Sequence, residues 1–294
     1  MRKPNFFIIG APKCGTSSVF TWLSTHPQIF TPEIKEMNFF SRDIWVPKRI
    51  SENDYLEAYQ EARSTQLRLC DASTRYLYSE EAIDNILDYC EGPKFIAMVR
   101  NPIDMVYSLY NHLVFINVEH CNSFREAWLL KDERLNGESI MEGCTDPCSL
   151  AYGEIGRLGD QIERFFNKVS PSNRLVIVLD DLESNPGSVY KKVINFLDLE
   201  DDMHTDFSVS NRSMVWRSKT LNRAILALAR AKSKLGINKS GFGLLNKLSR
   251  MNRKDTERDA LPVDLLDEMQ EFFFEDTLKL GELLRRDLSH WVSR

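Results

Sequence analysis

No stretch of the 294-residue chain approaches the roughly 20 consecutive apolar residues that a membrane-spanning helix requires. The N-terminus, MRKPNFFIIGAPK, contains an apolar run that is too short for a secretory signal. Internal repeats and low-complexity tracts are also absent from the sequence. We therefore expect a cytoplasmic protein without a transmembrane segment. Because 43% of the residues are apolar, the chain can bury one large core, and residues 1–294 are predicted to form a single domain.

Paired cysteine motifs and an excess of basic residues are missing as well. The six cysteines lack the CxxC spacing of a zinc site, and even the nearest pair, Cys144 and Cys148, is better explained as reduced, incidental thiols. A net charge of −5 at pH 7 argues against a general nucleic-acid-binding protein, which needs a dominant basic surface. Any anion-binding site in this chain must therefore be local.

One segment departs from this acidic average. Residues 212–258 contain 13 Lys or Arg and 2 acidic residues, which makes the segment +11 and leaves the remainder of the chain at −16. Two functional interpretations are a cover over a nucleotide and acceptor cleft, or a contact with a membrane surface or an anionic polymer. An ordinary pair of solvated helices is an equally good interpretation.

Short, continuously apolar runs alternate with stretches of helical periodicity. Such runs are typical of strands that are buried on both faces. The predicted strands are residues 5–10, 67–73, 94–99 and 174–179. Helical patterns cover residues 101–117, where Asn101 and Pro102 suit a helix start, and residues 261–291. This order predicts an α/β fold with a P-loop-like, mostly parallel central sheet flanked by helices and a helical C-terminal portion.

The segment from Gly10 to Ser18, GAPKCGTSS, has the G-x-x-x-x-G spacing of a phosphate-binding loop between a strand and a helix. In such a loop, backbone N–H groups and the helix dipole face an anion. A nucleotide triphosphatase carries Lys directly after the second glycine, but here that position is Thr16 and the lysine is Lys13. No second acidic motif for Mg²⁺ is evident, so a nucleotide kinase or NTPase would have to use a degenerate loop.

A second group of candidate anion ligands follows the predicted strand at 94–99. Arg100 comes directly after that strand, and Ser108 lies two turns into the next helix. The carboxyl ends of parallel strands share one edge of a sheet, so Arg100 can reach the same crevice as the phosphate-binding loop. A guanidinium can hold a phosphate through two hydrogen bonds, and a hydroxyl adds a neutral donor. His112 shares the helical face of Ser108, either as a base or as a packed core histidine.

Four motifs together resemble the sulfotransferases that use 3′-phosphoadenosine 5′-phosphosulfate (PAPS): PKCGTSS, KEMNFF, DASTRYL and MVRNPIDMVYSLYNH. The resemblance spans the whole chain and is closest to the glycosaminoglycan-type and bacterial members. It implies that PAPS is the co-substrate and that no metal is required. It also implies a 3′-phosphate site at Arg100 and Ser108 and a general base at Glu36. The loop residues that would hold the 5′-phosphosulfate are Lys13, Cys14, Gly15, Thr16, Ser17 and Ser18.

The chain departs from this family at one position of the third motif. A lysine that is often found there is replaced by Ala72, and Arg75 is a possible substitute for it. The family also suggests Tyr152 and Gly153 as residues of an acceptor channel, whereas Tyr76 is equally well explained as a core residue.

The implied reaction moves a sulfuryl group from PAPS to a hydroxyl or amine of a carbohydrate, lipid or small molecule and releases 3′-phosphoadenosine 5′-phosphate (PAP). Lys13 would neutralise charge on the leaving group, and Glu36 would accept the proton of the acceptor. His112 is an alternative base. A non-catalytic PAP-binding module is a second alternative beside the nucleotide kinase or NTPase.

Overall fold

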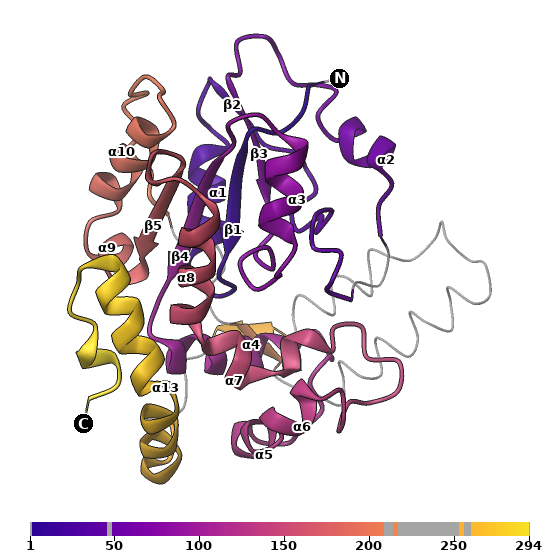
Figure 1. Ribbon diagram of the computed structural model, residues 1–294, viewed down its shortest axis with the longest axis vertical. Helices are drawn as coiled ribbons and strands as arrows, with labels where there is room; N and C mark the ends of the chain where they lie inside the picture. The colour runs from indigo at the N-terminus through magenta and orange to yellow at the C-terminus, as the bar shows by residue number, and fades with distance from the viewer. Residues whose placement is uncertain (1, 46–48, 209–213, 217–252, 256–259, 294) are drawn as a thin grey trace.

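The computed structural model describes residues 2–45, 49–208, 214–216, 253–255 and 260–293 (Figure 1). Its centre is a five-stranded parallel sheet in the order β2-β3-β1-β4-β5. The strands of this sheet are β1 Phe6–Gly10, β2 Ile29–Phe30, β3 Arg68–Ala72, β4 Lys94–Val99 and β5 Arg174–Val178. Helices flank the sheet, which confirms the predicted α/β fold with a parallel central sheet.

The longer helices connect the strands and cover the sheet. They are α1 Thr16–Leu23, α3 Ala82–Tyr89, α4 Pro102–Phe115, α8 Leu158–Lys168, α10 Pro186–Phe196 and α13 Val263–Leu284. Shorter helical elements lie in the connections. They are α2 Glu52–Glu57, α5 Phe124–Leu129, α6 Lys131–Leu135, η1 Cys148–Leu150, α7 Tyr152–Gly156, η2 Pro171–Asn173, α9 Leu179–Ser184 and η3 Ser289–Trp291.

The central strand β1 explains the apolar run near the N-terminus. Its first four side chains, from Phe6 to Ile9, are fully buried because β3 and β4 pair with it on either side and helices cover both faces. Phe7 lies in register with Asp71 of β3 and with Phe95 of β4. All these strands run in the same direction, so the segments that follow β1, β3 and β4 open at one edge of the sheet.

Helix α4 begins as its sequence predicts. The Asn101 side chain accepts a hydrogen bond from the N–H of Ile103 at 2.9 Å, and Pro102 occupies the first turn. The helix ends at Phe115, slightly before the predicted end at residue 117, and a residue with left-handed backbone, Asn117, follows. The local capping signals therefore determine the start of α4 more closely than its end.

The predicted helical C-terminal portion is present. Helix α13 packs against α8, and the Asp276 carboxylate accepts hydrogen bonds from the N–H groups of Gly159 at 2.8 Å and Asp160 at 2.9 Å. These two N–H groups belong to the first turn of α8, where a carboxylate interacts favourably with the helix dipole. Contact with α8 therefore ties the C-terminal helix to the sheet domain.

Most of the basic segment at 212–258 lies outside the described residues. Within it, the structure describes only the backbone of the antiparallel pair β6 Met214–Trp216 and β7 Arg253–Asp255, and β6 lies against α4 (Figure 1). None of the described helices combines the length and the hydropathy that a membrane crossing would require. The six cysteines, all of which are among the described residues, are free thiols.

Candidate functional site

The turn between β1 and α1 depends on two glycines. Gly10 has φ of +135°, and a Cβ there would lie 2.4 Å from the carbonyl oxygen of Thr74. Gly15 has φ of +86°, and a Cβ there would lie 2.9 Å from Leu179 Cδ1. Gly15 caps α1 without a side-chain hydrogen bond, and the first turn that follows it is the positive end of the helix dipole. This geometry suits an anion.

Lys13 and Cys14 form the turn itself. Lys13 has a left-handed backbone with φ of 62°, and its carbonyl oxygen accepts a hydrogen bond from Arg100 Nη1 at 3.2 Å. Cys14 is fully buried, and its Sγ donates to the carbonyl oxygen of Pro12 at 3.4 Å. Burial raises the pKa of this thiol to about 12, although Arg100 and Lys13 partly oppose the rise. Cys14 can therefore offer a ligand only its backbone.

The hydroxyl side chains of the loop meet a lysine that the sequence analysis overlooked. Lys35 Nζ lies 3.5 Å from Thr16 Oγ1, 3.3 Å from Ser17 Oγ and 3.2 Å from Glu36 Oε1. Ser18 is buried behind them at 5% exposure. The motif KEMNFF contains Lys35 beside Glu36, so a signal was present, but only the tertiary fold shows that Lys35 reaches the loop.

Glu36 is held at the end of β3. Its backbone is left-handed with φ of 62°, and its N–H donates to the carbonyl oxygen of Ala72 at 3.0 Å. The carboxylate accepts hydrogen bonds from the backbone N–H of Thr74 at 2.8 Å and from Thr74 Oγ1 at 3.1 Å. The side chain remains 37% exposed. A carboxylate fixed in this way and open to solvent can accept a proton from a bound molecule.

A buried network behind Glu36 fixes the same segment. Asp71 is fully buried and accepts hydrogen bonds of 2.8 Å from the hydroxyls of Tyr55, Ser73 and Tyr76. Ser73 Oγ in turn accepts from the N–H of Asn38 at 3.1 Å. Burial raises the pKa of Asp71 to about 6, against the lowering effect of these hydroxyls. Tyr76 is therefore a core residue, one of the two interpretations of the sequence.

Arg100 lies one strand away from the loop. Besides the carbonyl of Lys13, it contacts Asp104 Oδ2 at 3.3 Å, and its side chain is only 14% exposed. Ser108 is buried at 5% exposure on α4, two turns further along. The structure therefore brings Arg100 to the phosphate-binding loop, as the sequence analysis expects.

His112 shares the helical face of Ser108. The structure places His112 as an exposed residue and not as a packed core histidine, while its surroundings and the charge of Lys13 lower its pKa. His112 is therefore neutral near pH 7.

Three other candidates have contacts elsewhere in the protein. Arg75 forms an ion pair with Asp146, whose side chain is 9% exposed, so this guanidinium is already neutralised. Tyr152 is fully buried, and its hydroxyl donates to Glu119 Oε2 at 2.8 Å beside the buried Arg134–Glu119 ion pair. Gly153 lies against Phe272, whose Cζ would be 3.0 Å from an added Cβ. Tyr152 therefore packs in the core, and Arg75 is poorly suited to replace the family lysine.

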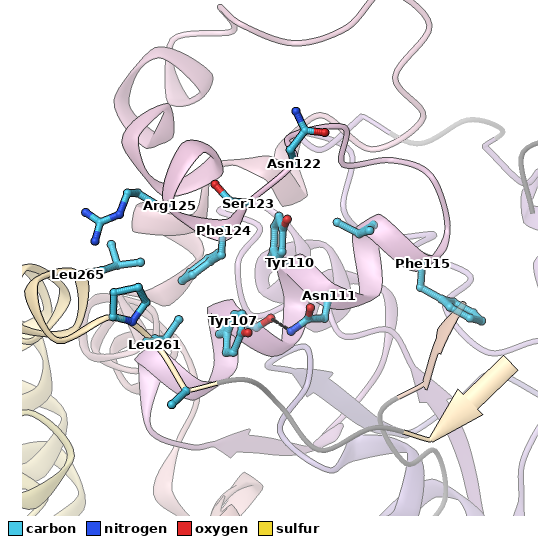
Figure 2. Close-up of a pocket in the computed structure, with 13 residues that line it drawn as sticks. Tyr107, Tyr110, Asn111, Phe115, Asn122, Ser123, Phe124, Arg125, Leu261 and Leu265 are labelled. Atoms are coloured by element: carbon cyan, nitrogen blue, oxygen red, sulfur yellow. Dashed lines mark hydrogen bonds between the residues drawn. The ribbon is translucent and has the colours of Figure 1, made fainter. Parts of the chain in front are cut away.

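A pocket opens between α4, α5 and the start of α13 (Figure 2). Its volume is about 540 Å³. Tyr107, Tyr110 and Phe124 form one wall, with Phe124 5.0 Å from Tyr107 and 5.3 Å from Tyr110 between ring centroids. Arg125 at the rim pairs with Asp264 at 2.6 Å, so the charged group that lines the pocket is neutralised. The pocket offers aromatic faces and neutral polar groups.

The described residues contain no group of three or more His, Cys, Asp or Glu side chains that could hold a metal ion. The charged groups at the edge of the sheet are instead suited to an organic anion, because Lys35 and Arg100 contact the loop before α1 and Lys13 is part of that loop.

Residues 3–279 match the sulfotransferase domain family. The chain belongs to the sulfotransferase family. Among curated members, human bifunctional heparan sulfate N-deacetylase/N-sulfotransferase 3 is 26% identical over 207 residues, which cover 67% of this chain and 22% of the relative. Mouse carbohydrate sulfotransferase 15 is 22% identical over 246 residues, which cover 67% of this chain and 44% of the relative. The chain therefore spans less than half the length of these sulfotransferases.

Solved sulfotransferase structures share the fold. The crystal structure of a sulfotransferase from Alicyclobacillus acidocaldarius is similar over 100% of both chains, with a TM-score of 0.75 and 25% identity. A mouse sulfotransferase in complex with PAP has a TM-score of 0.53 and 15% identity over 97% of this chain and 89% of that chain. These findings confirm the predicted family and fold.

Proposed function

We propose that this chain transfers a sulfuryl group from PAPS to a hydroxyl or amine and releases PAP. The observation that carries the proposal is the grouping of Lys13, Glu36 and Arg100 around the open N-terminus of α1, in a chain of the sulfotransferase family. A nucleotide kinase or NTPase is disfavoured by the same family match. A non-catalytic PAP-binding module is disfavoured because Glu36 is fixed but exposed at the site.

On the donor side, the first-turn N–H groups of α1 and the hydroxyls of Thr16 and Ser17 would bind the 5′-phosphosulfate, with Gly15 allowing the close approach. Lys13 would neutralise charge that develops on the leaving phosphate oxygen. Arg100 and Ser108 would hold the 3′-phosphate, since a partly buried guanidinium binds a phosphate strongly and selectively.

Glu36 would act on the acceptor side. The acceptor oxygen or nitrogen forms a bond to sulfur, the bond from sulfur to the bridging oxygen breaks, and that oxygen keeps the electron pair on PAP. Glu36 takes the proton that the acceptor loses. His112 is the alternative base, on the helical face of α4 that carries Ser108.

For the acceptor we propose a carbohydrate, because the curated relatives named above act on heparan sulfate or on carbohydrates. Phe115 lies three residues after His112 and seven after Ser108, so it extends their helical face into the pocket beside α4. We propose that this pocket receives a ring of the acceptor that does not react. Its size is in the range of small-molecule sites.

The remaining proposals concern the whole chain. We propose that residues 1–294 form one domain and that the protein is cytoplasmic. For the basic segment at 212–258 we propose two alternative roles from its charge alone: it covers the cleft, or it contacts an anionic polymer or a membrane surface.

The test is calorimetry, which measures the affinities of PAP, AMP and ATP·Mg²⁺ for the wild type and for Arg100→Ala. We expect PAP to bind the wild type more tightly than the other two nucleotides, and Arg100→Ala to lose PAP affinity by about tenfold to a hundredfold. AMP lacks the 3′-phosphate, so its affinity should not change. Arg157→Ala removes another Arg–Asp pair near a helix start, with Asp160 at 2.7 Å, and should bind PAP normally. Equal PAP affinity of Arg100→Ala and wild type would show that the 3′-phosphate site is misplaced.

Glu36→Gln tests the chemical step. This variant should bind PAP like the wild type but transfer radiolabelled sulfate from PAPS at least about a hundredfold more slowly, because Gln cannot accept the proton. Undiminished transfer would assign the base to another residue.

A further inference from the structure

Lys35 occupies the space between the two halves of the proposed site. Its ammonium lies within 3.5 Å of the hydroxyls of Thr16 and Ser17 on the donor side and 3.2 Å from the Glu36 carboxylate on the acceptor side. The side chain is 22% exposed, so it is partly desolvated but can still reach a bound molecule. An ammonium group has three N–H donors and can contact all three oxygens at once.

Two arginines also lie near this edge. Arg75 is paired with Asp146, and Arg100 contacts the Lys13 carbonyl and Asp104 at the proposed 3′-phosphate site. Lys35 contacts two neutral hydroxyls as well as the Glu36 carboxylate, and the hydroxyls belong to the residues that the proposed function assigns to the donor. The negatively charged sulfuryl group of this donor would offer Lys35 a stronger partner than the hydroxyls do, because hydrogen bonds between charged groups are about twice as strong as neutral ones.

We propose that Lys35 is a catalytic residue that contacts the transferred sulfuryl group while Lys13 contacts the leaving phosphate. This role rests on the proposed function. Lys35 stands next to the base, so it lies where the attacking acceptor, the sulfur and Glu36 would meet. A cation fixed there stabilises negative charge on the sulfuryl oxygens in the transition state and needs no metal to do so.

The position of Lys35 also explains how the site can function with alanine at position 72, where the family often has a lysine. The Ala72 carbonyl accepts a hydrogen bond from the N–H of Glu36, the residue that follows Lys35. Ala72 is 2% exposed and contributes no charge. Lys35 therefore supplies from the opposite segment the positive charge that Ala72 lacks.

The experiment compares Lys35→Met with wild type in two measurements. Calorimetry gives the affinity for PAP, which has no sulfuryl group. The release of PAP from PAPS gives the transfer rate, and it is measured once with N-desulfated heparan sulfate as the acceptor and once with water as the only acceptor. We expect PAP affinity within about threefold of wild type and a transfer rate lower by about a hundredfold or more. Lys35→Arg should restore part of the rate, because it restores the charge at a slightly different position.

Lys168→Met is the matched control. Lys168 has a similar exposure of 24% and a similar ion pair, with Asp84 at 2.6 Å, but it lies at the end of α8. The control should change neither quantity. A transfer rate of Lys35→Met within threefold of wild type would overturn the catalytic role of Lys35. A parallel loss of PAP affinity and transfer rate would also overturn it, because it would mean that Lys35 only holds the loop. Wild type that fails to bind PAP would overturn the proposed function itself.

Discussion

At the residue scale, Gly15 links the backbone of the loop to the core beneath it. Its left-handed φ of +86° and the 2.9 Å approach to Leu179 both require a residue without a Cβ. The same residue precedes α1 and so directs the first turn of that helix. A change at Gly15 should therefore affect stability and ligand binding together.

We predict that Gly15→Ala lowers the free energy of unfolding by about 2 to 4 kcal/mol, the sum of backbone strain and crowding against Leu179. Gly137→Ala is the matched control: Gly137 has a φ of +81°, but nothing lies within 4 Å of an added Cβ. It should cost only the strain, about 1 kcal/mol. Urea unfolding of both variants measures the difference, and equal losses would contradict the crowding.

Asp71 gives a second prediction at this scale. Burial raises its pKa from 3.8 to about 6 in the folded state, despite the hydrogen bonds from Tyr55, Ser73 and Tyr76. A group with a raised folded pKa contributes stability that is present below pH 4 and is lost as the pH rises through about 6. The size of the effect is about 3 kcal/mol, because one pH unit corresponds to about 1.4 kcal/mol.

The measurement is the difference in unfolding free energy between wild type and Asp71→Asn from pH 4 to pH 7. We expect wild type to lose stability relative to the variant across this range, because Asn does not titrate. A difference that is constant with pH would show that the Asp71 pKa is not raised.

At the scale of elements, helix α4 joins the two parts of the proposed site. Its N-terminus follows Arg100, one face carries Ser108 and His112, and Phe115 at its end lines the pocket. In Figure 2, Tyr107 and Asn111 of α4 and Phe124 of α5 point toward the same space. One rigid helix can therefore set the distance between the donor and the acceptor.

We predict that Tyr107→Ala raises the KM for a carbohydrate acceptor by about tenfold and leaves PAP affinity unchanged, because the variant removes an aromatic surface of the pocket and no donor contact. Phe274→Ala is a suitable control, since Phe274 is 42% exposed on α13 and does not line the pocket. Steady-state kinetics distinguish the two variants. An unchanged KM would remove the pocket from the acceptor site.

At the scale of the whole molecule, the sheet order explains why the site residues converge. The strand β1 is central, and β3 and β4 pair with it on either side. The loop after β1, the segment around Thr74 after β3 and Arg100 after β4 consequently share one edge. The C-terminal helix α13 is tied to this domain through α8.

We predict that the described elements unfold as one unit. Tryptophans report from distant places, with Trp22 on α1, Trp128 on α5 and Trp291 in η3. Urea unfolding followed by tryptophan fluorescence and by far-ultraviolet circular dichroism should give coincident transitions, as a single cooperative domain does. Separate midpoints would mean that the chain contains more than one folding unit.

Much of the fold was predictable because its signals are local. The continuous apolar runs identified four strands within one or two residues of their observed ends, and Asn101 and Pro102 identified the start of α4. The two-residue strand β2 was missed because so short an element produces no periodicity. The C-terminal helical pattern was predicted through residue 291, but α13 ends at Leu284.

The sequence by itself determined the α/β fold, the phosphate-binding loop and the candidates Lys13 and Arg100, because spacing along the chain reflects the geometry of strands, turns and helix starts. Glu36 became a candidate through the resemblance to the sulfotransferases. Only the tertiary structure decided which lysine and arginine side chains lie at the site. Arg75 meets Asp146 across 71 positions of sequence, whereas Lys35 reaches Ser17 across 18. Such contacts depend on how separate segments meet at the edge of the sheet, and no local pattern in the sequence encodes that meeting.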